Sequence, residues 1–192
     1  MHLRLFPFFD EITAEGVFTV LRALLSVNPP NGIYVNSPGG RFDFFSSLGP
    51  AIERQGIITL SQDVSSAAVL LTLLGHKRYA FGDSTFYFHE VRAMIGDPLD
   101  EITICDIETV IDEQERIEAE DRENLEEWLF QMRVAQSWFL QFIARRTGVR
   151  PAVFLDLMRQ EATLNAREAV HYGIIHEVLP IQIRESPLLL TH

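Results

Sequence analysis

Two polar side chains in this sequence, Ser66 and His89, have the residue types and surroundings that acyl-transfer chemistry needs. Ser66 follows a predicted strand over 56–60 and a turn of small residues, and it stands at the start of an apolar helical pattern. At such a point, free backbone N–H groups and the helix dipole favour developing negative charge. His89 ends an aromatic run that begins at Phe86, and an imidazole is the usual base for a serine hydroxyl. A serine in this place also serves as an ordinary helix N-cap, so Ser66 alone does not specify a reaction.

A glycine-rich turn and two late carboxylates extend this pattern. Ser37-Pro38-Gly39-Gly40 directly follows the β-rich run Ile33-Tyr34-Val35. Paired glycines let a backbone approach a ligand with its N–H groups turned outward, as an oxyanion site requires. An acid is needed to orient the imidazole, and Asp156 and Glu161 both qualify from the sequence. The combined pattern predicts acyl transfer by a serine nucleophile, a histidine base and one of these two acids.

Alternating strand and helix patterns place these residues at the ends of strands. The first half predicts helices over 13–27, 44–54 and 69–74, and strands over 33–35, 56–60, 77–81 and 85–89. Between 102 and 146 the pattern becomes a long helix or two helices, followed by helices over 152–159 and 166–172 and a strand over 174–179. This order predicts the α/β class, a parallel sheet covered by helices.

The composition predicts one compact cytoplasmic domain, and we expect neither a metal nor a cofactor. The chain has 192 residues, of which 47% are hydrophobic, enough for one core of ordinary size. Its single cysteine, Cys105, excludes a disulfide framework and a multi-cysteine zinc site and fits a reducing compartment. No window approaches the ~18 consecutive apolar residues that a membrane span needs. The first residues are charged too soon for a signal peptide.

The formal net charge of −11 is concentrated in one segment. Asp100 to Glu127 contains 13 acidic residues and two arginines, and the rest of the chain has 14 residues of each sign. Phosphate binding needs a basic surface, so nucleic acid is not expected as a partner, and an acidic substrate would be repelled. The segment is interpreted either as a solvated helical face or as a docking surface for a basic partner.

Four motifs follow one another along the chain. They are Tyr34-Val35-Asn36-Ser37-Pro38-Gly39-Gly40, Ser65-Ser66-Ala67-Ala68-Val69-Leu70-Leu71, Phe86-Tyr87-Phe88-His89, and the stretch from Glu161 to Gly173. Their order resembles the proteolytic subunit of the Clp protease. The Ser-Ala-Ala sequence and the Glu161 stretch are also similar to phage-type relatives, the prohead proteases. The resemblance covers nearly all of the chain from Phe6 to Val178, apart from the acidic segment.

This resemblance implies a fold, an activity and an assembly. The implied fold is ClpP/crotonase-like, with stacked ββα units, one peptidase domain over residues 1–192, and an extended acidic helical handle over 96–146. Ser66 matches the family nucleophile, His89 the general base and Glu161 the third triad member, while the N–H groups of Gly40 and Ala67 match the oxyanion hole. The implied protein is a serine endopeptidase that cleaves peptides or unfolded protein inside a homo-oligomer of one ring or stacked rings.

The triad departs from the family pattern in two places. The family places its nucleophile in a Gly-x-x-Ser-x-Gly setting, where this chain has Asp63 and Ala68 in place of both glycines. Ser65 is an adjacent hydroxyl, and Ser66 is preferred because its place at the first helical turn matches the family. The usual third member is aspartate, so the glutamate at 161 leaves Asp156 open as the alternative acid.

Two further departures concern partners. The sequence begins almost at the expected first helix of the fold, so we expect the axial-loop segment that contacts an ATPase unfoldase in Clp peptidases to be absent, and dependence on that ATPase is left open. The handle is longer and more acidic than in the family. Trp128, Leu129, Trp138 and Phe139 offer more apolar area than an isolated helix exposes. They predict a homo-oligomer, unless the handle packs on its own head domain.

Two other functions fit the same residues. A catalytically inactive ClpP-like scaffold or regulatory subunit would explain the lost glycines and the substituted acid. A crotonase-type acyl-CoA enzyme shares the fold and a similar oxyanion hole, although it needs no serine nucleophile. No membrane partner is expected.

Overall fold

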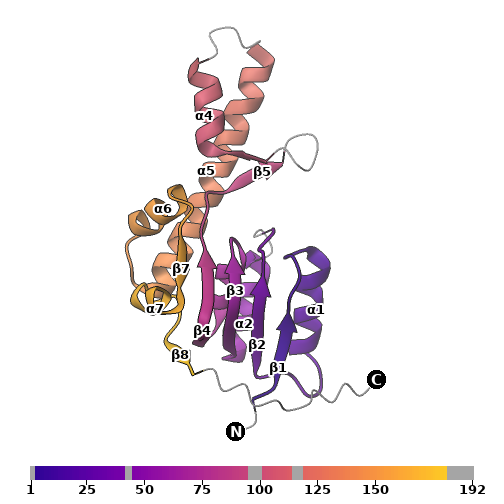
Figure 1. Cartoon of the computed structure of the whole chain (residues 1–192). Coiled ribbons are helices and arrows are strands. Elements are labelled where there is room, and N and C mark those ends of the chain that lie inside the picture. The colour runs from indigo at the N-terminus through magenta and orange to yellow at the C-terminus, as the bar shows by residue number, and fades with distance from the viewer. Residues whose placement is uncertain (1–2, 42–44, 95–100, 114–118, 181–192) are drawn as a thin grey trace.

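A mixed, mostly parallel sheet forms the centre of the molecule. The computed structural model describes residues 3–41, 45–94, 101–113 and 119–180. In these ranges the strand order is β1 (Leu5–Phe8), β2 (Gly32–Ser37), β3 (Ile58–Ser65), β4 (Lys77–Tyr87) and β7 (Thr163–Asn165), with β8 (Glu177–Leu179) also paired to β4. Strands β1 to β4 run parallel, β7 is antiparallel to β4, and β8 is parallel to it. The predicted α/β class is confirmed (Figure 1).

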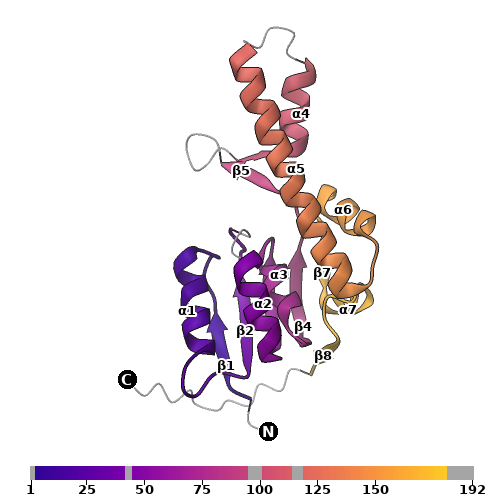
Figure 2. The same cartoon turned by 180° about the vertical axis from the view of Figure 1, so that it is seen from behind.

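Helices connect the parallel strands and cover one face of the sheet. These helices are α1 (Ala14–Leu24), α2 (Phe45–Gln55) and α3 (Ala68–Leu74). Figure 2 shows α2, α3 and the C-terminal half of α5 on the same side of the strands. All seven residues of α3 are buried, as the apolar run predicted for a helix enclosed on every side.

Strand β4 is one element where the sequence predicted two. It runs for 11 residues through Gly82 and Ser84, and its pairing with β3 shifts register between Ser61 and Asp63. Ser84 Oγ accepts the N–H of Phe81 and donates to the carbonyl of Ser61, both at 2.9 Å. The turn residues at 82–84 therefore form a bulge that the two neighbouring strands hold by hydrogen bonds, and the strand continues past it.

Three short or extended strands also differ from the prediction. β1 and β7 were not predicted, because runs of four and three residues carry little periodic signal. β3 continues to Ser65, five residues beyond the expected end at Leu60. This extension matters for the site, since it brings the strand directly to Ser66.

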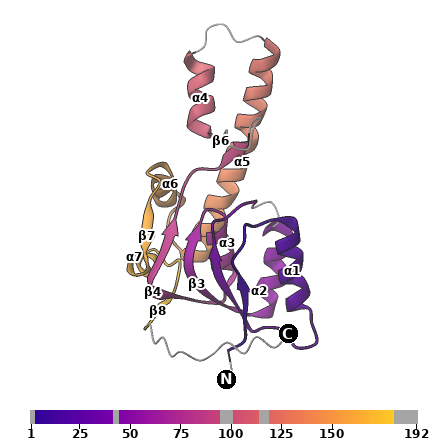
Figure 3. The same ribbon diagram turned by 45° about the vertical axis from the view of Figure 1, so that its right-hand side comes forward.

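The handle projects from the sheet and has its own small core. A hairpin of β5 (Arg92–Met94) and β6 (Glu101–Thr103) leads into α4 (Ile104–Glu113) and the 29-residue α5 (Ala119–Thr147). Figures 1 and 3 show α4 and the N-terminal half of α5 standing clear of the sheet. Ile104, Ile107, Leu129 and Met132 form a separate apolar cluster between them. The predicted helical region is therefore two helices, and the hairpin was not foreseen.

The C-terminal half of α5 belongs to the main core. Phe139, Phe142 and Ile143 are buried in the same cluster as the sheet and α3. Helices α6 (Pro151–Arg159) and α7 (Ala166–His171) follow, and Asn165 and Glu168 form a capping box at the start of α7. None of the helices in the described ranges combines the length and apolar character that a membrane crossing requires.

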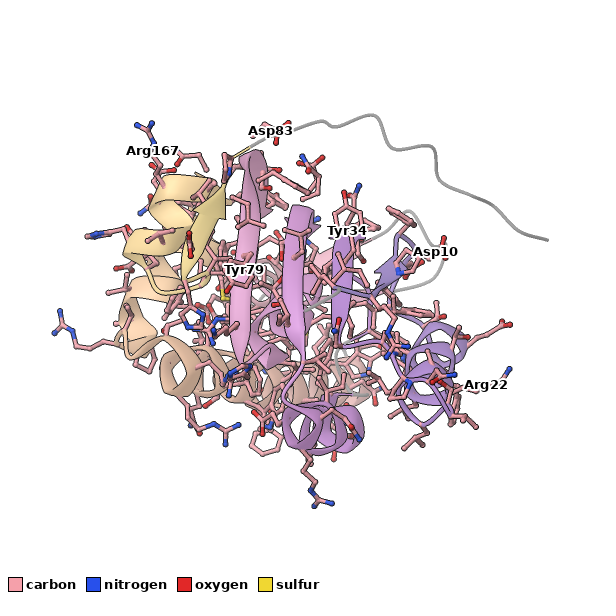
Figure 4. All side chains as sticks on the ribbon, turned by 90° about the horizontal axis from the view of Figure 1, so that it is seen from below. Asp10, Arg22, Tyr34, Tyr79, Asp83 and Arg167 are labelled. Atoms are coloured by element: carbon pink, nitrogen blue, oxygen red, sulfur yellow. The ribbon has the colours of Figure 1, made fainter. Side chains whose placement is uncertain are left out.

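The buried Arg78 connects several segments at the base of the fold by hydrogen bonds. Its guanidinium is 5% exposed and donates to the carbonyls of Ile174 (2.8 Å), Gly173 (3.0 Å) and Arg146 (3.2 Å). Burial and the neighbouring Arg146 lower the pKa of Arg78 to about 10. Figure 4 shows Tyr79, the next residue of β4, near the centre of the base, with Arg167 at the periphery. Arg78 therefore ties together the ends of α5 and α7 beneath the sheet.

Candidate active site

Ser66 stands on a strained turn between β3 and α3. Its φ is 54°, a left-handed conformation that is uncommon for residues other than glycine. The Ser66 N–H donates to the carbonyl of Tyr87 at 3.0 Å, which fixes the turn to the end of β4. The N-cap of α3 is Ala67, with no side-chain cap hydrogen bond. The half-buried Ser66 hydroxyl is therefore not used as a helix cap.

The glycine turn after β2 packs directly on Ser66. Gly39 and Gly40 have φ values of 103° and 126°, so both occupy a region that L side chains rarely adopt. A Cβ on Gly39 would lie 2.7 Å from Ser66 Cβ, which shows how closely the turn approaches the serine. Two hydrogen bonds with Ile12 hold the turn. The Ile12 N–H donates to the Gly39 carbonyl at 2.6 Å, and the Arg41 N–H donates to the Ile12 carbonyl at 2.9 Å.

Two backbone N–H groups beside Ser66, one in the glycine turn and one at the start of α3, have no acceptor among the described residues. Within the described part of the chain, the N–H groups of Gly40 and Ala67 donate to no acceptor. Unpaired N–H groups that line the same cavity as a serine hydroxyl are the kind of donors that can stabilise a tetrahedral oxyanion. These are the two positions that the resemblance assigns to the oxyanion hole, and that role stays a prediction.

His89 lies two residues beyond the end of β4 and is half-buried. Its Nδ1 atom is 2.6 Å from the carbonyl oxygen of Glu90. Because a carbonyl only accepts, Nδ1 carries the proton in the neutral ring and Nε2 has the free lone pair. Burial lowers the pKa of His89, and Arg92 lowers it further, while the Glu90 carbonyl, Glu101 and Glu161 act in the opposite direction. The ring is therefore held neutral, in the tautomer that a general base needs.

One cavity brings the serine, the histidine and the glycine turn together. Its volume is about 650 Å³. The residues that line it include Gly39, Gly40, Ser66, Ala67 and His89, with Phe139 and Met158 as part of its apolar wall. Ser66 and His89 are both described, and no hydrogen bond joins the hydroxyl to the ring. The cavity is large enough for several residues of an extended peptide.

Glu161 lies outside this cavity and is bound by an arginine. Its Oε1 atom accepts from Arg92 Nη2 at 2.8 Å, and Arg92 Nη1 donates to Glu101 at 2.6 Å. The Glu161 side chain is 57% exposed, but it is near enough to raise the pKa of His89. Asp156, the alternative acid, is exposed on α6 and does not line the cavity. The structure thus brings together four of the five predicted site residues and sets Glu161 beside them.

Known proteins match this chain in sequence and in fold. A sequence model of the family described as Clp protease matches residues 4–182. The chain belongs to the Clp protease family. The ATP-dependent Clp protease proteolytic subunit 2 of Pseudomonas aeruginosa is 26% identical over 180 residues, which are 88% of this chain and 76% of that protein. Proteolytic subunit 1 of Rhodococcus jostii is 30% identical over 179 residues, 88% of this chain and 70% of that protein.

A solved structure supports the same fold. The structure of a ClpP1 mutant from Listeria monocytogenes superposes with a TM-score of 0.62 at 18% identity, and the match covers 94% of this chain and 93% of that one. The predicted ClpP-like fold is therefore confirmed. In the described residues, no group of three or more His, Cys, Asp or Glu side chains is placed to hold a metal ion.

In this Clp protease family chain, a buried polar network that the sequence did not reveal anchors the segment after His89. Glu90 is only 8% exposed, and its carboxylate accepts from Gln136 Nε2 at 3.2 Å and from the Cys105 thiol at 3.3 Å. Gln136 Oε1 accepts the N–H of Val91 at 3.0 Å. The contact with Glu90 raises the pKa of the Cys105 thiol. The signal that was available is Gln136 itself, a polar residue next to the apolar stripe of its helix.

Proposed function

We propose that this Clp protease family chain is a serine endopeptidase that cleaves peptides or unfolded protein. One observation carries the proposal: a single cavity is lined by Ser66 on its left-handed turn, by His89, and by Gly40 and Ala67, whose N–H groups donate to no acceptor among the described residues. Each of these groups has a defined role in acyl transfer.

The mechanism follows from the tautomer of His89. Nδ1–H donates to the Glu90 carbonyl, so Nε2 takes the proton of the Ser66 hydroxyl as Oγ bonds to the peptide carbonyl carbon. The N–H groups of Gly40 and Ala67 stabilise the negative oxygen of the tetrahedral intermediate. The carbon–nitrogen bond then breaks, and His89 gives its proton to the leaving amine. Water, deprotonated by His89, releases the acyl group and restores Ser66.

Glu161 is the acid that we propose for the third role, acting through its field. Its carboxylate bonds to Arg92, while the Glu90 carbonyl occupies Nδ1 of the imidazole. The effect of Glu161 on the pKa of His89 favours the imidazolium that forms during catalysis. Asp156 has no comparable effect on His89, so it is the weaker choice.

The expectation that Leu129 and Phe139 are exposed is wrong, because Leu129 packs in the handle cluster and Phe139 in the main core. Trp128 and Trp138 are exposed as expected, and with other exposed apolar side chains they support assembly into a ring-shaped homo-oligomer. On α5, Phe130 is 67% and Val134 53% exposed, and they lie one helical turn apart. On α1, Phe18 is 63% exposed. Apolar area of this size is normally covered in the working molecule. We propose that residues 1–192 form one peptidase domain with residues 96–146 as its handle, and that the protein works in the cytoplasm.

Active-site labelling and peptide hydrolysis together test the proposal. A fluorophosphonate should label the wild type and the Ser65→Ala variant but not the Ser66→Ala or His89→Ala variants. The purified wild type should hydrolyse short fluorogenic peptides, and Ser66→Ala should not. Labelling that survives Ser66→Ala would overturn the assignment of the nucleophile.

An inactive scaffold is the second candidate function. It is favoured by one observation, the pairing of Glu161 with Arg92 in place of a hydrogen bond to the imidazole. Wild-type protein that is folded and assembled, yet neither labelled nor able to cleave any peptide, would support the scaffold and exclude the peptidase. Measurable hydrolysis by the wild type that is lost in Ser66→Ala would exclude the scaffold.

A further inference from the structure

Glu11 places a carboxylate beside the oxyanion turn. It is the second residue before Thr13, the N-cap of α1, and it lines the same cavity as Ser66 and His89. A Cβ on Gly40 would lie 2.7 Å from Glu11 Cγ, so the side chain of Glu11 rests against the glycine that we propose as an oxyanion donor. A substrate bound for attack by Ser66 must therefore pass close to this carboxylate.

The other charges around the cavity already have partners. Arg92 is bonded to Glu101 and Glu161, and Glu90 is bonded to Gln136 and Cys105. Arg41 is engaged in an interaction of its own. Among the described residues, no hydrogen bond or ion pair involves the Glu11 carboxylate. Among the described charged residues that line the cavity, Glu11 is therefore the one whose carboxylate is available to a substrate.

A second cavity next to the first is also lined by acidic side chains. Glu11 also lines this cavity, which has a volume of about 470 Å³, and Asp10 and Glu15 line it as well. None of the described residues around it is Lys, Arg or His. Figure 4 shows Asp10 on the β1 side of the molecule, opposite Arg167 of α7. The two cavities share Glu11, so the negative field extends from the oxyanion turn along the β1 side.

We infer that Glu11 is a specificity-determining residue that selects peptides with a lysine or arginine next to the scissile bond. The inference rests on the proposed peptidase function and names the substrate class of that site. A substrate ammonium or guanidinium group gains the attraction of Glu11, whereas an acidic side chain is repelled by it. Because Glu11 is exposed, the pair is worth no more than an exposed ion pair, which limits the preference to about fivefold.

The test compares kcat/KM for quenched fluorogenic peptides that differ only in Lys, Gln or Glu at each of the two positions flanking the scissile bond. The wild type should favour the Lys peptide over the Gln peptide by about fivefold. The preference should shrink toward one at about 1 M salt, where screening acts within ~3 Å. Glu11→Gln should bring the ratio close to one at low salt, and Glu11→Lys should reverse the order in favour of the Glu peptide.

Glu177→Gln is the matched control, because it removes the same charge from an exposed glutamate on β8 that lines neither cavity. This variant should keep the wild-type ratio, so a lost preference there would assign the effect to net charge and overturn the inference. Equal cleavage of the Lys and Gln peptides by the wild type would also overturn it while leaving the peptidase function intact. A wild type that cleaves none of the peptides and takes no fluorophosphonate label would overturn the proposed function and this inference together.

Discussion

Replacing Gly39 by alanine tests how the oxyanion turn depends on its close approach to the serine. The new Cβ would lie 2.7 Å from both Ser66 Cβ and the Ser65 carbonyl oxygen, and the backbone at this position has a φ of 103°. Contacts this short force the turn or the serine to move. If the turn moves, the Gly40 N–H leaves the oxyanion position, and the loss of one such donor costs ~10²–10³-fold in kcat, or ~2.7–4 kcal/mol.

Gly56→Ala is the matched control for this change. Gly56 also has a positive φ, 60°, but an added Cβ meets nothing within 4 Å. Both variants therefore carry a backbone cost of ~1–2 kcal/mol in stability, and only Gly39→Ala disturbs the site. The assay is kcat/KM on a fluorogenic peptide, with urea unfolding to check that both variants are folded. Activity of Gly39→Ala within tenfold of Gly56→Ala would refute the reasoning.

Three other predictions follow from the contacts around the site and beneath the sheet. Because the pKa of His89 is lowered, kcat/KM should stay high below pH ~6.5. Since Arg92 helps to lower this pKa, Arg92→Gln should shift the loss of kcat/KM at acid pH to higher pH. An unchanged pH profile would show that Arg92 does not act on the ring. Glu161→Gln should lower kcat/KM by roughly fivefold, because an exposed carboxylate acts weakly through its field, and a loss as large as that of His89→Ala would instead indicate a direct triad bond. Arg78→Met should lower the free energy of unfolding in urea by ~2–4 kcal/mol, because it leaves carbonyl groups beneath the sheet without donors. The control Arg167→Met removes an exposed arginine and should cost less than ~0.5 kcal/mol. Equal losses in the two variants would contradict the role given to Arg78.

That Ser66 and His89 share one cavity could be predicted from the sequence because their signals are local. Ser66 stands where a strand meets an apolar helix, and His89 ends an aromatic run of sequence, so each position follows from a short stretch of chain. The glycines at 39 and 40 are equally local, since their backbone conformation is one that other residues rarely adopt. In a parallel sheet these strand ends meet at one edge, which is where the cavity lies.

The surroundings of Glu161 could not be predicted, because its partner is far away in the sequence. Arg92 and Glu161 are 69 residues apart, and Arg92 lies on a three-residue strand of a hairpin that has too few residues for a periodic signal. The contact between Glu90 and Gln136 spans 46 residues and depends on how α5 crosses the molecule. Side-chain pairs of this kind are decided by tertiary packing, which periodicity and residue type do not encode.

A crystal structure of the protein after reaction with a fluorophosphonate tests the central claim most directly, because the adduct imitates the tetrahedral intermediate. We expect a covalent bond from Ser66 Oγ to phosphorus, and a phosphonyl oxygen ~2.7–3.1 Å from the N–H groups of Gly40 and Ala67. We also expect His89 Nε2 within hydrogen-bond reach of the modified oxygen. An adduct on another residue, or one whose oxygen points away from both N–H groups, would contradict the account.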